Sequence, residues 1–172
     1  MRRKRGTLFD EERLPSDLAK MKAMPVPTEK DWGDYQSDLD RKYAHDLFAG
    51  HTNEQMRPHF RRNPIERTDE LRWMPEAPFR YYMLGFRDCV MDRDFDSLET
   101  SNAASCFLGL IIEKLEKQPQ VIVPIMPELL PAVEHVARNQ ALYEAEESIY
   151  GNFLEKLARI QALSAAEPKE LI

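Results

Sequence analysis

Residues 98–115, LETSNAASCFLGLIIEKL, decide the fold expected for this chain. Between Ala103 and Ile112 the only polar residue is Ser105, and the only residue without a side chain is Gly109. A helix needs roughly 20 apolar residues to span a bilayer, so this run is too short. A helix that is apolar on nearly every side must instead be covered by other parts of its own protein. The stretch therefore predicts the buried central helix of a helical domain.

The composition fits a single domain of ordinary size. Hydrophobic residues make up 42% of the 172 residues, enough for a core, since a chain of this length buries roughly two-thirds of its unfolded surface. The net charge is -6, which disfavours general binding to nucleic acid or to anionic membranes. The balance of charge favours a basic partner or none.

The sequence also predicts a cytoplasmic protein without a cofactor. Cys89 and Cys106 lie in apolar helical contexts without CxxC spacing, as expected of buried free thiols. The basic start MRRKRG is followed by acidic residues rather than by the apolar core of a signal peptide.

We expect an all-α, single-domain bundle of about five to six helices around the buried central one. Residues 1–27 are expected to form a flexible basic segment, residues 28–166 the helical domain and residues 167–172 a frayed tail. Strand-like alternation of apolar and polar residues is nearly absent from the sequence.

Two helix starts are marked by capping boxes, Thr28 with Asp31 and Thr52 with Gln55. The first helix should end at Gly50 and bury one apolar stripe, formed by Trp32, Tyr35, Leu39, Tyr43 and Leu47. Pro58 should shorten or kink the second helix. The proline-containing region after it is expected to be a loop, with at most one helical turn at residues 65–72.

The second half of the chain offers fewer boundaries. Pro78 is placed to begin a helix, and the prolines around residues 121–123 predict a buried extended connection there. No proline interrupts residues 132–167. We expect one long helix kinked near Gly151 there, with two separate helices as the alternative.

No pattern of catalytic or metal-binding residues stands out. The spacing of His45, His51, His59 and His135 matches no zinc motif. There is no GxSxG sequence and no glycine-rich phosphate loop. The sequence therefore does not predict an enzyme.

Three charged clusters are candidates for binding. The basic run with Arg57, Arg61 and Arg62 would either grip nucleic acid or pair with the chain's own carboxylates, and the acidic net charge favours the second. One acidic cluster precedes the central helix, where it either stabilises the helix start or contacts a basic partner; it consists of Asp92, Asp94, Asp96 and Glu99.

The third cluster is expected on one face of the last helix, because its members are three or four residues apart. They are Tyr143, Glu146, Glu147 and Tyr150. Tyrosines mixed with carboxylates suit an exposed protein interface, although a solvated outer face is the alternative.

Part of the sequence resembles a known class of protein. The segments concerned are PFRYY at 78–82, the apolar helix at 106–115 and LYEAEESIYGNF at 142–153. Over roughly residues 74–160 the chain is similar to small acidic immunity proteins encoded beside bacterial polymorphic or type VI secreted toxins. The resemblance implies a non-enzymatic cytoplasmic protein that binds one toxin, such as a basic nuclease-like effector, and occludes its active cleft.

Overall fold

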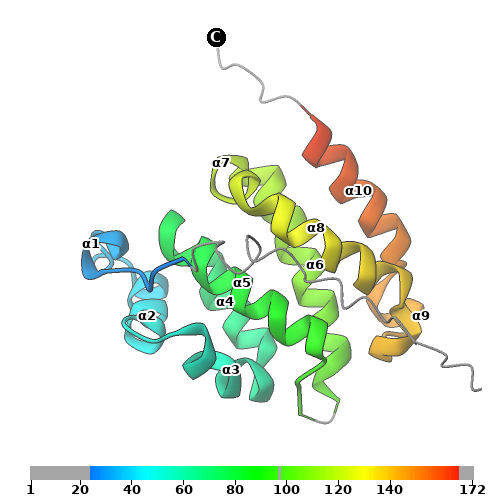
Figure 1. Cartoon of the computed structure of the whole chain (residues 1–172), viewed down its shortest axis with the longest axis horizontal. Coiled ribbons are helices and arrows are strands. Elements are labelled where there is room, and N and C mark those ends of the chain that lie inside the picture. Colours follow the sequence, from blue (N-terminus) through cyan, green and yellow to red (C-terminus); the bar gives the residue numbers. More distant parts are fainter. Residues whose placement is uncertain (1–23, 97, 167–172) are drawn as a thin grey trace, which may run out of the picture.

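The computed structural model describes residues 24–96 and 98–166, which form helices and contain no strand (Figure 1). The predicted all-α class is thereby confirmed. Residues 1–23 of the segment expected to be flexible, and the expected tail 167–172, lie outside the described residues. In chain order the elements are α1 Glu29–Trp32, α2 Leu39–Phe48, α3 Asn53–Arg62, α4 Pro64–Trp73, α5 Glu76–Asp92, α6 Glu99–Lys117, α7 Pro119–Ile122, η2 Val123–Ile125, α8 Met126–Arg138, η3 Gln140–Tyr143, α9 Glu147–Tyr150 and α10 Phe153–Ala165.

The predicted central helix is α6. It contacts α4 and α5 on one side and α10 and α7 on the other, so several elements cover it as expected (Figure 1). Phe107, Leu108 and Ile111 are fully buried in the core. Gly109, by contrast, faces solvent, so one narrow strip of the helix is uncovered.

A second helix, α5, is buried as deeply as α6 and holds the two halves of the molecule together. It packs against α1, α3 and α4 on one side and against α7 and α8 on the other. Arg80 donates hydrogen bonds to the carbonyl oxygens of Val121 and Gln120, and Arg87 donates one to that of Glu128. These charged bonds tie α5 to α7 and α8.

The beginning of α3 packs tightly against α5. A Cβ atom on Gly85 would lie 2.2 Å from Oδ1 of Asn53. The Asn53 side-chain amide donates to the Tyr81 carbonyl oxygen at 3.0 Å, and the Asn53 backbone amide donates to the Tyr81 hydroxyl at 3.2 Å. Only glycine at position 85 leaves room for this contact.

The two capping boxes and the stop at Gly50 are confirmed, whereas the apolar stripe expected between Thr28 and Gly50 is only partly correct, since Trp32 is buried and Tyr35 and Leu47 are half-buried. Both capping boxes form, and Gly50 has a positive φ of 77° just after α2. The chain leaves the helix at Gly33, however, and α2 restarts in a different phase. It buries Ala44 and Phe48 and leaves Leu39 and Tyr43 exposed.

Two segments expected to be irregular are helical, which explains part of the excess over the five to six helices expected. Residues 64–73 form α4, which starts with Pro64 in its first turn and is capped by the Asn63 side chain. Pro119 likewise opens α7, so the segment 121–123 is helical rather than extended. Pro58 is accommodated inside α3, which runs for ten residues.

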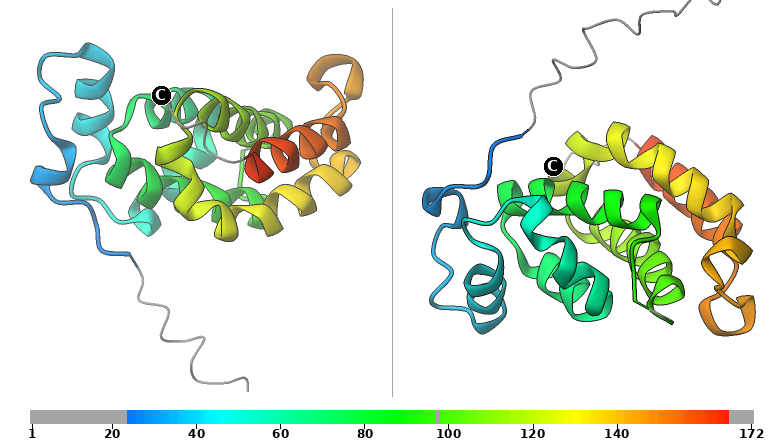
Figure 2. Two further views of the ribbon diagram at one scale, coloured as in Figure 1. Left: turned by 90° about the horizontal axis from the view of Figure 1, so that it is seen from above. Right: turned by 60° about the horizontal axis from the view of Figure 1, so that its bottom comes forward.

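The single kinked helix expected over residues 132–167 does not form, and the alternative of separate helices is what the structure shows, in α8 and α10. The chain reverses between α8 and α10, which pack side by side (Figure 1). Glu144 adopts a left-handed conformation with φ 54°, Gly151 has φ 75°, and Asn152 caps α10 through its side chain. This connection, residues 139–152, projects at the end of the molecule opposite α1 and α2 (Figure 2).

Candidate functional site

The acidic turn before α6 is tied to the basic run of α3. Arg57 donates to Asp92 at 2.7 Å, and Arg61 donates two hydrogen bonds to Asp94, each 2.9 Å long. The bonds from Arg61 lower the pKa of the Asp94 carboxyl below its ordinary value. Asp96 is exposed. Two of the four predicted partner-binding carboxylates in this turn, Asp92 and Asp94, are therefore engaged within the chain.

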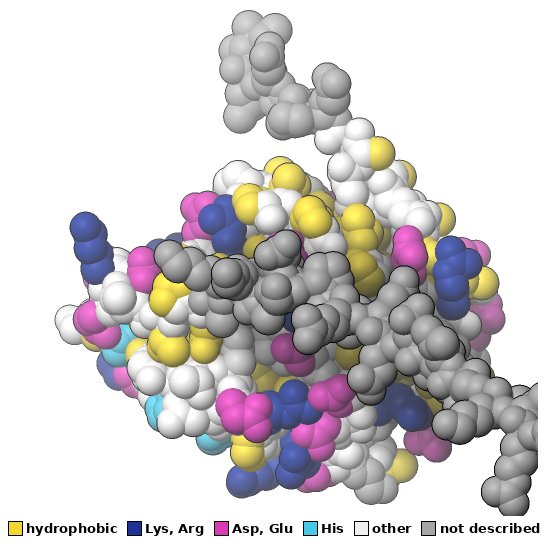
Figure 3. Space-filling view, viewed as in Figure 1, with side chains coloured by type: hydrophobic (Ala, Val, Ile, Leu, Met, Phe, Trp, Pro, Cys, Tyr) yellow, Lys and Arg dark blue, Asp and Glu magenta, His cyan; other side chains and the backbone are white. Residues whose placement is uncertain are grey.

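Arginines elsewhere in the described residues follow the same pattern. Arg67 pairs with Glu66 and Glu70, Arg72 with Asp69 and Glu113, and Arg159 with Glu116. Acidic and basic side chains are accordingly interspersed on the face shown in Figure 3. Arg57 and Arg61 of the basic run are thus paired with carboxylates of the same chain.

The predicted face of tyrosines and glutamates does not exist as one surface. Tyr143 is fully buried, and its hydroxyl donates to the Val90 carbonyl oxygen at 2.9 Å. Tyr150 lies against α6, where its hydroxyl donates to Asn102 Oδ1 at 2.8 Å. The expectation of one helical face was wrong because the chain turns after η3, so that Tyr143 and Tyr150 belong to different elements.

The two glutamates of that cluster are nevertheless exposed and lie beside a hollow in the surface. The hollow has a volume of about 500 Å³ and is lined by Gln140, Ala141, Glu144, Ala145, Glu146 and Glu147. No basic side chain belongs to this lining. Two apolar side chains of the same connection are also exposed, Ile149 by 69% and Leu142 by 44%. The connection 139–152 therefore presents carboxylates and apolar surface together.

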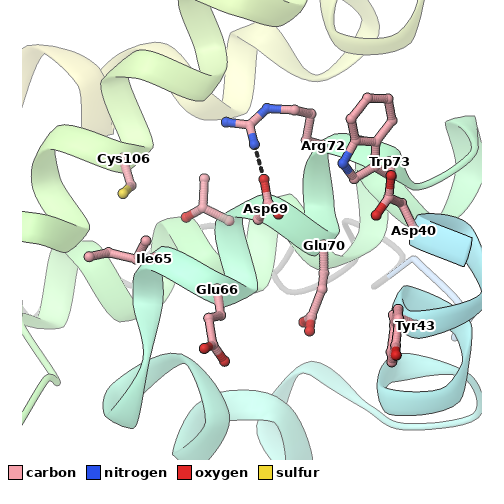
Figure 4. Close-up of a pocket in the computed structure, with 10 residues that line it drawn as sticks. Asp40, Tyr43, Ile65, Glu66, Asp69, Glu70, Arg72, Trp73 and Cys106 are labelled. Carbon is pink, nitrogen blue, oxygen red and sulfur yellow. Dashed lines mark hydrogen bonds and ion pairs between the residues drawn. The ribbon is translucent and has the colours of Figure 1, made fainter.

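A groove between α2, α4 and α6 was not foreseen from the sequence. It encloses about 350 Å³ and is lined by Asp40, Tyr43, Ile65, Glu66, Thr68, Asp69, Glu70, Arg72, Trp73 and Cys106 (Figure 4). The sequence predicts a buried Tyr43 and at most one helical turn at residues 65–72, within a loop. Asn63 and Pro64 are signals for a helix start at this position. A helix beginning there places Ile65, Glu66, Asp69 and Trp73 on an exposed face.

The nucleophilic and titratable side chains of the interior have structural environments. Burial raises the pKa of the Cys89 thiol to about 12 and also raises that of Cys106, so both favour the neutral thiol. Lys114 is buried, and its ammonium group donates to the Arg72 carbonyl oxygen at 2.7 Å and to Gln118 Oε1 at 2.6 Å. Burial lowers the pKa of Lys114 to about 8.

His45 has a structural role at the junction of α1 and α2. Its ring stacks on Tyr35 at a centroid distance of 3.5 Å, and its Nε2 lies 2.9 Å from Glu29 Oε2. The side chain thus joins α1 to α2. Across residues 24–96 and 98–166, no three His, Cys, Asp or Glu side chains are grouped as ligands for a metal ion.

Comparisons with family models, curated proteins and solved structures gave no match to this chain. In the described part of the chain, no helix is both long and apolar enough to cross a bilayer.

Proposed function

We propose that this chain is a non-catalytic binding protein that captures a basic partner protein through the connection 139–152. The observation that carries this proposal is the hollow beside Glu144, Glu146 and Glu147, whose lining holds three carboxylates and no basic group. Exposed Ile149 lies on the same connection. An apolar anchor bordered by charge is the usual composition of a protein interface.

The distribution of charge supports a basic partner. Arg57, Arg61 and Arg67 are already paired with carboxylates of the chain, so they contribute little positive field at the surface. An uncompensated acidic surface speeds the capture of a basic protein and makes that association sensitive to salt.

The resemblance to immunity proteins makes a toxin the partner that we propose. The connection projects from the body of the bundle, which suits insertion into the active cleft of a basic nuclease-like effector acting in the cytoplasm (Figure 2). Carboxylates placed there would take the positions of substrate phosphates. Neutralisation would then follow from occlusion, without any chemical step.

Nucleic-acid binding by the basic run remains the weaker proposal. Arg57 and Arg61 would have to release Asp92 and Asp94 before they could contact phosphates. A free basic groove with stacking aromatics is what single-strand binding requires, and neither arginine borders one of the two hollows described here.

The test compares two variants with equal loss of charge. Glu146→Gln/Glu147→Gln alters the connection, and Glu54→Gln/Glu134→Gln removes two exposed carboxylates elsewhere. Wild-type protein used as bait in its native cells should retain one basic protein in stoichiometric amount. That protein should arrest growth when expressed alone, and co-expression of the wild type or the control variant should restore growth.

The Glu146→Gln/Glu147→Gln variant should bind the partner at least about tenfold more weakly in low salt, because two charges facing it are lost. Equal protection by all three proteins would show that the connection is not the binding surface. A partner without toxicity would leave capture in place but refute the immunity role.

A further inference from the structure

The groove between α2 and α4 points to a second binding site, separate from the connection 139–152. We propose that it receives arginine side chains from an extended basic segment of another protein. The groove is lined by residues of α2, α4 and α6, and no residue of the connection belongs to its lining. Its ligand would therefore be bound whether or not the connection binds a partner.

The walls of the groove are large apolar side chains that the fold leaves uncovered. Tyr43 on α2 is 68% exposed, and Ile65 and Trp73 on α4 are 51% and 43% exposed. Leu39, one turn before Tyr43, is 73% exposed on the same helix. Folding normally buries such residues, and exposed Trp and Tyr are enriched at the energetic centres of interfaces.

The charge of the lining selects the occupant. Four carboxylates and only one guanidinium, that of Arg72, border the groove. Arg72 is engaged by Asp69 and Glu113, and Glu66 and Glu70 flank Arg67. Asp40 has no ion-pair partner among the described residues, and it lines the groove together with Trp73 (Figure 4). An anionic or purely apolar ligand would be repelled or would leave these carboxylates desolvated.

Arginine satisfies both features of the groove at once. Its planar guanidinium stacks on aromatic faces, here those of Tyr43 and Trp73, and donates two parallel bonds to a carboxylate such as Asp40. Lysine offers a compact, strongly hydrated charge without a stacking plane. The volume of about 350 Å³ lies at the lower end of the range for ligand pockets, which suits side chains of a peptide rather than a larger ligand.

The groove is held open before any ligand arrives. Lys114 fixes the end of α4 to α6 through the Arg72 carbonyl oxygen, and the Arg72 side chain donates to Glu113 on α6 at 2.9 Å. The Thr68 hydroxyl donates to the Pro64 carbonyl oxygen at 2.7 Å, which anchors the floor of the groove within α4. A preformed site loses less conformational entropy on binding.

The experiment uses the full chain and a fluorescein-labelled Gly-Ser peptide with arginine at every third position, compared with the same peptide in which citrulline replaces arginine. Binding is followed by the anisotropy of the label. Emission from Trp73 gives a second readout, because the only other tryptophan, Trp32, is buried. The variants are Asp40→Asn and Trp73→Ala in the groove, with Glu54→Gln/Glu134→Gln, which removes two exposed carboxylates outside both proposed sites, as the control.

We expect saturable binding of the arginine peptide and a shift in Trp73 emission. Asp40→Asn and Trp73→Ala should each weaken binding about tenfold, and the citrulline peptide should bind at least about tenfold more weakly. The control variant should bind the peptide like the wild type, and both groove variants should still bind the partner of the connection, so loss of the proposed toxin contact and loss of this site are told apart. Circular dichroism of each variant checks that the helices are intact.

Three results would overturn the proposal. The first is equal binding of the arginine and citrulline peptides, and the second is equal binding by the wild type and both groove variants. The third concerns the basic residues at the start of this same chain. If replacing Arg2, Arg3, Lys4 and Arg5 by Gln strengthens peptide binding about tenfold, the chain's own segment is the occupant and not another protein.

Discussion

The acidic turn 92–99 and the connection 139–152 carry similar runs of carboxylates, yet they differ in what surrounds them. Asp92 and Asp94 are held by arginines that lie 35 and 33 positions away in the sequence. Glu146 is exposed, and Glu147 accepts only a long bond of 3.3 Å from the Asn152 amide. A carboxylate is therefore available to a partner only where no helix of the same chain brings a cation to it.

The largest effect should come from a change that separates α3 from α5. Gly85→Ala would place a Cβ atom 2.2 Å from Asn53 Oδ1 and push apart the contact that also brings Arg57 and Arg61 to the turn. Overpacking of this kind costs about 3 kcal/mol of unfolding free energy. The measurement is urea denaturation followed by far-UV circular dichroism.

Gly109→Ala is the matched control. Gly109 is an exposed position of α6, and a Cβ atom added there meets no atom within 4 Å. It should stabilise the protein by about 0.5–1 kcal/mol, because alanine loses less backbone entropy in a helix. If both substitutions have the same effect, the Asn53 contact does not constrain the packing of α3 on α5.

The second largest effect concerns Lys114. Unlike Arg57, this cation is buried and has no carboxylate hydrogen-bonded to it. The pKa of Lys114 is about 8 when folded and 10.5 as its ordinary value, so the unfolded state binds more protons between these pH values. Stability should therefore rise with pH, by about 2 kcal/mol between pH 7.5 and pH 10. This gain in stability should be lost again as the pH falls from 10.5 to about 8.

Lys114→Met isolates this contribution. The tyrosines and cysteines that titrate in the same range are common to both proteins, so they cancel in the difference between the two unfolding free energies. That difference should change with pH by the amount given above. Parallel stability curves would mean that Lys114 reaches water in the folded protein.

Features set by neighbouring residues could be predicted from the sequence. The apolar run predicted that α6 is buried. The capping boxes at Thr28 and Thr52 could be recognised because each is formed by two residues three positions apart. The reversal after α8 could not be predicted in this way, because Glu144 is an unusual residue for a left-handed conformation. Nothing local distinguishes it from a helical glutamate.

The candidate sites depend even more on distant parts of the chain. Tyr143 and Tyr150 fit one helical face by spacing, but the turn between them places the first in the core. The groove combines residues of α2, α4 and α6, and its exposed Tyr43 follows from the phase at which α2 restarts after Gly33. Which face of a helix is buried at such a restart is decided by its packing against other helices, and not by the spacing of apolar residues within the helix itself.

The third effect concerns the ion pairs of the turn directly. Asp94→Asn removes the two charged bonds from Arg61 and should cost about 1 kcal/mol at neutral pH, since the pair is partly exposed. The pKa of Asp94 is lowered in the folded protein, so its contribution is present above its ordinary value of 3.8 and is lost as the pH falls through the lower folded value.

The direction of this pKa shift can be tested by measuring stability against pH. The advantage of the wild type over Asp94→Asn in unfolding free energy should stay constant from about pH 7 to pH 5 and shrink below about pH 4. Arg61→Gln should lose the same pH-dependent advantage. An advantage that persists in strong acid would assign the effect to packing and not to the ion pair.

The smallest effect on stability is expected where the carboxylates have no cationic partner. Glu146→Gln/Glu147→Gln should change the unfolding free energy by less than about 0.5 kcal/mol, because neither side chain holds two helices together. Urea denaturation beside Asp94→Asn, in the same buffer, gives the comparison. A loss as large as that of Asp94→Asn would show that the connection uses these carboxylates internally, and the surface proposed for the partner would then not be free.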